Sequence, residues 1–179
     1  MKNKNNNKSG FTIIEVVLVL AIAGLIFLMV FIALPALQRS QRDTQRRDDM
    51  SRLSSQITQY QANNRGQTPK NDTTTYNATG TKYDRTTVAA NCKSWCSFIN
   101  NYMLAGGDTF DDPDGTAYTI TDHGDITGNV AVTVTSMDHS IHIYHKAKCA
   151  GETVEPATGT RQLAIRYKLE GAGTYCESL

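Results

Sequence analysis

The sequence has little net charge and only one long apolar run. Its 179 residues carry a formal net charge of +1, with 40% hydrophobic and 20% charged residues. These values exclude an intrinsically disordered chain and a strongly basic nucleic-acid-binding protein. Because no second long apolar run follows the first, the sequence also excludes a multi-pass membrane protein.

Catalytic motifs are missing as well. The sequence contains no nucleophile elbow and no glycine-rich phosphate loop, and its His, Asp and Ser residues follow no catalytic pattern. We therefore predict that the protein is not an enzyme, and we predict no cofactor.

The apolar run extends from Phe11 to Leu34 and contains only two polar residues, Thr12 and Glu15. As a helix it would be about 36 Å long, enough to cross the roughly 30 Å hydrocarbon core of a bilayer. It is too long for the apolar core of a cleaved secretory signal. A carboxylate in such a helix costs about 2.5–3.5 kcal/mol at its centre, so we expect Glu15 to have a function. The alternative is that Glu15 lies near the membrane surface and reaches water.

The residues around Glu15 form a specific pattern. The segment Lys-Ser-Gly-Phe-Thr-Ile-Ile-Glu, from Lys8 to Glu15, resembles the class III signal sequence of type IV prepilins and pseudopilins. The resemblance implies that a prepilin peptidase cuts between Gly10 and Phe11 on the cytoplasmic side and N-methylates Phe11. It also implies that Glu15 neutralises the terminal amine of a neighbouring subunit, which would set the axial register of subunit assembly.

The charges on either side of the apolar run bear on orientation. The leader has three lysines, so its removal would change the formal side-chain charge from +1 to −2. Five arginines follow the run: Arg39, Arg42, Arg46, Arg47 and Arg52. Their number alone favours a cytoplasmic C-terminal part. The resemblance and the cysteines favour the opposite side, and we expect the C-terminal part to lie outside the cytoplasm.

The sequence predicts four segments: a leader at 1–10, a hydrophobic transmembrane or filament-core helix at 11–37, an amphipathic continuation of that helix at 38–64, and a globular head at 65–179. An apolar stripe at helical spacing marks the continuation: Met50, Leu53, Ile57 and Tyr60. Gly24 and Pro35 weaken the helix. They mark either an ordinary glycine and kink of a membrane helix or a segment that extends during filament assembly.

The head has the pattern of an α+β fold. A short helix is predicted at 97–104, and strands are predicted at 116–121, 129–135, 140–146 and 161–169. We expect these strands to form an antiparallel sheet packed on the long helix, as in a pilin head. The segment Asp112-Pro113-Asp114-Gly115-Thr116-Ala117-Tyr118 also resembles the Asp-Pro-x-Gly-x-x-Tyr turn of major pseudopilins.

The four cysteines lie at positions 92, 96, 149 and 176, all after the apolar run. An even number in an exported domain indicates disulfides, and four cysteines allow three pairings. Cys149 and Cys176 each follow a predicted strand, and pilins often close their C-terminal region with a disulfide. The resemblance thus favours Cys149 with Cys176, which leaves Cys92 with Cys96.

Two metal sites deserve consideration. An acidic loop offers oxygen ligands for calcium from Asp108, Asp111, Asp112 and Asp114, but it lacks the spacing of an EF-hand. Cys92, Cys96 and the histidines at 139, 142 and 145 suggest zinc, but on one strand these histidines would not converge. We predict no metal, with the four aspartates as weak calcium candidates.

The leading hypothesis is a structural subunit of a type IV pilus-like filament. The resemblance implies other pilin subunits, a prepilin peptidase, an assembly platform protein and an ATPase as partners. It also implies a single-pass precursor in the cytoplasmic membrane and then a surface filament.

The alternatives are a minor pilin or a secretion or competence pseudopilin, and a monotopic membrane-anchored adhesin or binding domain. Nucleic-acid binding is left open as a further role, although the charge balance of the chain gives no support for it. The sequence does not distinguish adhesion, motility and DNA uptake.

Overall fold

The computed structural model describes residues 10–69, 95–105, 107, 109–131, 139–171 and 173–179. The chain forms two compact units, Met1–Gln38 and Arg39–Leu179. Helix α1 (Ile13–Asn63) begins in the first unit and ends in the second. The prediction of a long N-terminal helix followed by an α+β head is confirmed.

In the second unit, one face of α1 is buried. Met50, Leu53 and Ile57 are fully buried, and Tyr60 packs against the same core. The apolar stripe predicted from the sequence is therefore the face by which α1 contacts the head.

Two short helical elements cover part of this core. Helix α2 (Trp95–Phe98) continues directly into the π-helix η1 (Ile99–Met103), close to the helix predicted at 97–104. The Phe98 ring stacks on Tyr102 at 5.4 Å between centroids and meets Tyr60 of α1 edge-on at 5.7 Å. Aromatic pairs favour stacked and edge-on geometries of this kind, so contacts between aromatic rings help to hold α2 and η1 against α1.

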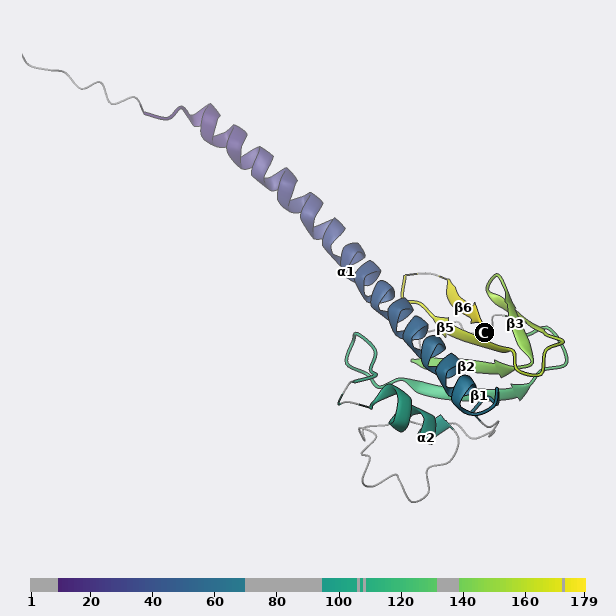
Figure 1. The fold of residues 1–179 in the computed structure, drawn as a ribbon. Helices are drawn as coiled ribbons and strands as arrows, with labels where there is room; N and C mark the ends of the chain where they lie inside the picture. The colour runs from purple at the N-terminus through teal and green to yellow at the C-terminus, as the bar shows by residue number, and fades with distance from the viewer. Residues whose placement is uncertain (1–9, 70–94, 106, 108, 132–138, 172) are drawn as a thin grey trace, which may run out of the picture. The chain divides into compact units, whose positions relative to one another are not determined.

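A four-stranded sheet forms the centre of the head, in the order β1-β2-β5-β6 (Figure 1). Its strands are β1 (Thr119–Asp125), β2 (Ser140–His145), β5 (Leu163–Lys168) and β6 (Thr174–Ser178). A separate antiparallel pair consists of β3 (Ala147–Ala150) and β4 (Thr153–Pro156).

The sheet is mixed, which corrects the expectation of a purely antiparallel one. Strand β1 runs parallel to β2, whereas β2, β5 and β6 pair antiparallel. The connection from β1 to β2 spans residues 126–139, and a connection of about a dozen residues or more lets a chain return and re-enter a sheet in the same direction. Alternation along a strand does not reveal this, because it is the same for both directions.

Several strand boundaries differ from those predicted. The strands at 140–146 and 161–169 are confirmed as β2 and β5, but the strand expected at 116–121 is β1, three residues later. Much of the strand expected at 129–135 lies outside the described residues, although Val130 forms a bridge with Val154. Strands β3, β4 and β6 were not predicted, because segments of four or five residues show too little alternation.

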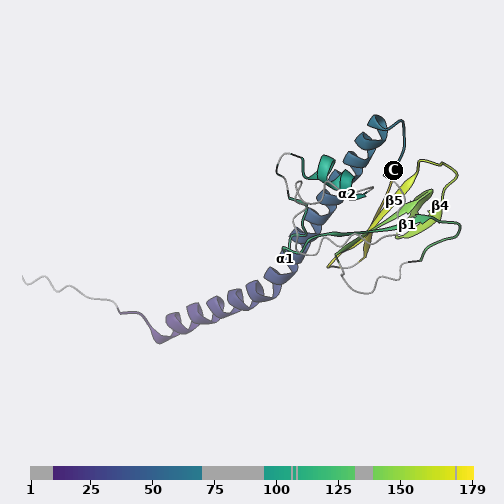
Figure 2. The same ribbon diagram turned by 90° about the horizontal axis from the view of Figure 1, so that it is seen from below.

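The two faces of the sheet bury different residues. Ile141, Ile143 and Ile165 belong to the same core cluster as the buried residues of α1 and α2. Helix α2 and the C-terminal part of α1 lie on one side of the sheet (Figure 2). Tyr144 and Ala164, the alternate residues, belong to a second cluster with Ala147 and Val154 of the β3–β4 pair. The head thus has three layers: helices, sheet and the β3–β4 pair.

A disulfide joins Cys149 of β3 to Cys176 of β6, as predicted, with the Cα atoms 5.9 Å apart. Cys92 and the side chain of Cys96 lie outside the described residues. Since β3 and β6 belong to different sheets, the disulfide ties the β3–β4 pair to the edge of the central sheet.

Removal of this disulfide should destabilise the head. Its sequence separation of 27 residues corresponds to about 3 kcal/mol in the chain-entropy model. We expect Cys149→Ser/Cys176→Ser to lower the free energy of unfolding by about that amount, measured by urea titration with the fluorescence of Trp95. Trp95 is the only tryptophan and is fully buried in the head, so it reports on that unit. Unchanged stability would contradict a structural role for this bridge.

Candidate functional site

Three hydrogen bonds close the first turn of α1. The backbone nitrogen and the hydroxyl of Thr12 both donate to Oε2 of Glu15 at 3.0 Å, and the Glu15 nitrogen donates to the Thr12 hydroxyl at 3.4 Å. This is a capping box, in which Thr at the N-cap and Glu three residues later satisfy backbone donors that the helix leaves free. The Glu15 carboxylate therefore has partners in its own chain.

The two residues before Thr12 are outside the helix and accessible. Gly10 is exposed, and a Cβ at this position would meet no atom of the described residues within 4 Å, apart from its chain neighbours. The side chain of Phe11 is exposed as well. An enzyme could therefore reach the Gly10–Phe11 bond without unfolding any described element.

The first half of α1 is apolar on all sides. Between residues 11 and 37, Glu15 is the single ionisable side chain. The most exposed large apolar side chains there are Phe11, Ile13, Ile14, Met29, Phe31 and Ile32. Within the described residues, α1 is the one helix long and apolar enough to cross a membrane by length and composition. A helix that is apolar all round needs a surrounding of lipid or of other apolar helices.

A family model of the prokaryotic N-terminal methylation motif matches residues 5–31. The match includes the Gly10–Phe11 junction, the capping box and much of the apolar helix. The chain has the N-terminus of a type IV pilin or pseudopilin. Neither the curated proteins nor the solved structures give a significant match to the chain.

A pilin-type N-terminus has general implications. The motif goes with processing by a prepilin peptidase, with other pilin subunits as partners and with a structural rather than an enzymatic role. A membrane-anchored precursor that later joins a surface filament suits both the motif and the apolar helix.

Gly24 and Pro35 lie within this pilin-type N-terminal helix. Helix α1 is continuous through both residues, although Pro35 provides no backbone donor. A Cβ on Gly24 would meet no atom within 4 Å, so no contact within the described chain requires a glycine there.

A buried charged cluster fastens α1 to the rest of the head. We call it the Arg46 cluster; its members are Arg42, Asp43, Arg46, Asp112 and Glu170. The Arg46 guanidinium is 1% exposed and donates to both oxygens of Asp112 at 2.7 Å, to Asp43 at 2.9 Å and to Glu170 at 3.1 Å. These carboxylates hold the pKa of Arg46 above its usual value. The cluster joins α1 to the turn before β1 and to the loop between β5 and β6.

The remaining polar groups of the cluster are also satisfied. Asp43 accepts hydrogen bonds from the backbone nitrogens of Glu170 and Gly171 at 2.9 and 2.8 Å. Asp112 accepts one from the Tyr167 hydroxyl at 2.7 Å. Burial, followed by this bond to Asp112, raises the pKa of Tyr167. A buried ion pair of this kind is stable only when such additional bonds are present.

The Glu170 carboxylate makes the stability of the head depend on pH. Hydrogen bonds from Arg42, and then from Arg46, lower its pKa from an ordinary value of 4.5 to about 2. Between these two values the unfolded state binds more protons than the folded state, so stability falls as the pH falls through this window. We expect Glu170→Gln to flatten the loss of unfolding free energy between about pH 4.5 and 2, measured by Trp95 fluorescence. Parallel profiles for the variant and the unchanged chain would contradict this.

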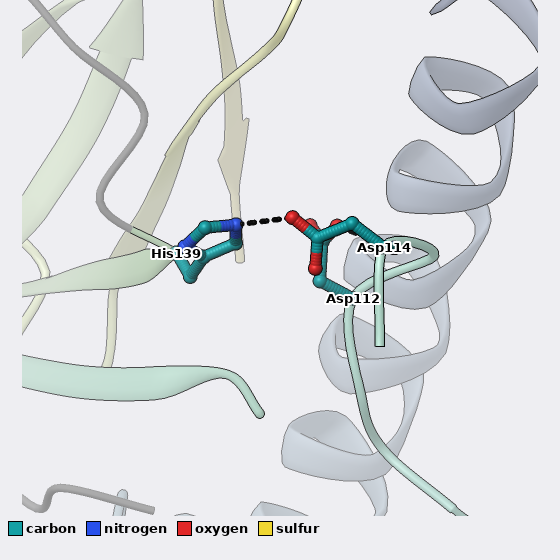
Figure 3. A group of neighbouring side chains, drawn as sticks. All are labelled: Asp112, Asp114 and His139. Atoms are coloured by element: carbon teal, nitrogen blue, oxygen red, sulfur yellow. Dashed lines mark hydrogen bonds and ion pairs between the residues drawn. The ribbon is translucent and has the colours of Figure 1, made fainter. Parts of the chain in front are cut away.

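The four calcium candidates have different surroundings. Asp108 lies outside the described residues, and Asp111 is exposed. Asp112 belongs to the Arg46 cluster. Oδ2 of Asp114 contacts Nε2 of His139 at 2.7 Å, and the ligand atoms of Asp112, Asp114 and His139 lie within 4.8 Å of one another (Figure 3). Burial opposes the effect, but bonds from Thr116 and His139 lower the pKa of Asp114 to about 2.

The histidines considered for zinc face different partners. His139 contacts Asp114, His142 contacts His123 at 2.9 Å, and His145 contacts Asp122 at 3.1 Å. These contacts do not bring the three rings to one point.

Sequence reasoning missed the Arg46 cluster, although a signal for it was present. Counting back from Met50, Arg46 lies four residues earlier and Asp43 three residues before that. Both therefore continue the buried stripe of α1, and a charge on a buried stripe indicates a partner within the fold. Their partners, Asp112 and Glu170, are too distant in sequence to identify by pattern.

Proposed function

We propose that the protein is the precursor of a structural subunit of a type IV pilus-like filament. A prepilin peptidase removes residues 1–10 and methylates Phe11, and the apolar helix at 11–37 then packs against those of other subunits. The amphipathic continuation at 38–64 and the head at 65–179 form the outer part of the subunit. The observation that carries the proposal is a pilin-type N-terminus on a helix with one capped carboxylate and apolar side chains all round.

Glu15 has the chemistry for pairing subunits. In the single chain its carboxylate accepts from Thr12 alone among the described groups, at one of its two oxygens. The other oxygen is available to the terminal amine of Phe11 in a neighbouring subunit. In apolar surroundings this charge pair would offset part of the cost of burying each charge. Gly24 and Pro35 would mark the part of the helix that extends as subunits pack.

Intact mass spectrometry of the mature protein tests the processing step. The full chain is expressed with and without a prepilin peptidase, extracted from membranes and analysed. We expect the enzyme to produce a chain that begins with methylated Phe11. A chain that keeps its leader, or that is cut at another bond, would overturn the proposal.

Glu15→Ala separates a filament subunit from a membrane-anchored domain that never polymerises. A filament subunit should lose most of its incorporation into sheared surface filaments, because the terminal amine loses its partner. Ile26→Ala, a change on the same helix with no charge, is the matched control and should keep incorporation. Processed Glu15→Ala that assembles as well as the control would favour the anchored domain. Filament assembly would require an assembly platform protein and an ATPase, and deletion of either should leave the processed subunit in the membrane.

A further inference from the structure

A polar pocket lies at the end of α1, where residues that follow the helix meet one end of the central sheet. Its volume is about 460 Å³, and its lining includes Arg65, Thr68, Asp125, His145, Thr160 and Arg161. Strands β1 and β2 end at this edge and β5 begins just after it, since Asp125 pairs with His145 and His145 with Leu163. Four separate segments therefore build the pocket: the residues after α1, the ends of β1 and β2, and the residues before β5.

Arg65 occupies a backbone position that usually belongs to glycine. The nitrogen of Gly66 donates to the carbonyl of Gln61 at 2.6 Å, which is the longer bond of a Schellman motif at a helix C-terminus. Arg65 is the left-handed residue of this motif, with φ of 58°. Side chains seldom occur in this conformation, and such strain is typical of functional sites.

Arg161 is positioned from the other side of the pocket. A Cβ on Gly66 would lie 2.6 Å from Cζ of Arg161, so the guanidinium rests directly on the glycine backbone. The side-chain nitrogen of Gln61 also donates to the Arg161 carbonyl at 3.1 Å. Glycine at position 66 thus lets the second guanidinium approach the chain that carries Arg65.

Thr68 contacts the buried pair formed by His145 and Asp122, which orients its hydroxyl. Nε2 of His145 lies 3.1 Å from Oδ2 of Asp122, and a carboxylate only accepts, so that nitrogen carries the proton. Nδ1 of the same ring contacts the Thr68 hydroxyl at 3.4 Å. Trp95 donates to the same Asp122 oxygen at 2.6 Å and holds it in place.

The charges of the pocket are unbalanced. Within the described part of the chain, neither Arg65 nor Arg161 forms an ion pair, whereas Asp125 is paired with Lys146 at 2.5 Å. We propose that this pocket binds the carboxylate of an acidic sugar, such as a uronate unit of a surface polysaccharide. The two guanidiniums hold the carboxylate, and Thr68, Thr160 and Asp125 accept or donate hydrogen bonds to the sugar hydroxyls.

The lining favours a sugar over a nucleic acid. Asp125 can accept hydrogen bonds from sugar hydroxyl groups, donors that the phosphodiester groups of a nucleic acid lack. A nucleic-acid site normally extends along a basic stripe, and the side chains after the leader have a net charge of −2. Guanidinium groups bind carboxylates with two parallel hydrogen bonds.

Nuclear magnetic resonance titration of the full chain in a sugar-free detergent tests this inference. The probes are galacturonate, galactose, inorganic phosphate and a short single-stranded oligonucleotide, and the amide signals of Thr68 and Arg161 are followed. We expect saturable shifts with galacturonate and none with galactose. Arg161→Gln and Arg65→Gln should each weaken galacturonate binding about tenfold, the effect of losing a charged hydrogen bond. Arg47→Gln, an exposed arginine of α1 away from the pocket, is the control and should bind as the unchanged chain does.

Other results would overturn the inference. Absence of galacturonate binding, or equal binding by both pocket variants and the control, excludes the site. Phosphate binding as tight as that of galacturonate indicates a general anion site, and tighter oligonucleotide binding indicates a nucleic-acid site. Because unassembled protein is used, these outcomes do not depend on filament formation.

Discussion

Gly10→Val is expected to abolish removal of the leader. A branched side chain at the junction would obstruct the cleavage site of the peptidase, whereas a Cβ at this position meets no atom of the described residues within 4 Å, apart from its chain neighbours. The substitution therefore leaves the fold unchanged, and lost processing reports recognition alone. The measurement is the ratio of precursor to mature chain by mass spectrometry after co-expression with a prepilin peptidase.

Gly24→Ala is the matched control for this experiment. Gly24 also has no atom within 4 Å of a Cβ, but it lies in the interior of α1. Alanine is favoured over glycine in a helix interior by about 1 kcal/mol, so the variant should fold and be processed. Normal maturation of Gly10→Val would rule out the proposed junction. Failure of both variants would indicate a general loss of membrane insertion.

Arg46→Met should destabilise the head by about 3–5 kcal/mol. The substitution keeps most of the side-chain volume but leaves Asp43 and Asp112 buried without their shared cation. At this size of domain, the midpoint of thermal unfolding should fall by roughly 10 °C or more. Urea titration followed by Trp95 fluorescence gives the free energy directly.

Two further variants test the cause of this effect. Arg47→Met changes an exposed arginine next to Arg46 and should alter stability by no more than about 0.5 kcal/mol. Arg46→Met/Asp112→Asn removes one of the stranded charges and should recover part of the loss. Equal stability of Arg46→Met and Arg47→Met would show that the Arg46 cluster contributes little to the attachment of α1.

Helices and strands whose apolar residues recur at a regular local spacing could be predicted from the sequence. The helical stripe at Met50, Leu53 and Ile57 gave the buried face of α1, and alternation in β2 and β5 gave the centre of the sheet. The disulfide between Cys149 and Cys176 followed from the resemblance to pilins.

Features that depend on long-range pairing could not be predicted. The parallel direction of β1 depends on the path of the chain between strands. The last residues of β1, Asp122 to Asp125, are poor strand formers, and Asp122 is stabilised there by Trp95 and His145. Arg46 and Asp112 are 66 residues apart, and no local pattern joins them.

The capping box at the start of α1 lies entirely within the part of the chain that the proposed cleavage would retain. The side-chain hydrogen bonds of the capping box join Thr12 and Glu15, which both lie on the C-terminal side of the proposed cleavage site. A chain cut at the proposed junction would therefore keep a complete helix start, and cleavage would not need to refold it. The proposed cleavage would instead change the electrostatics: the side-chain charge would fall from +1 to −2, and a positive amine would appear four residues before Glu15. If the proposed processing occurs, the amine that pairs with Glu15 of a neighbouring subunit would therefore exist only after the leader has been removed.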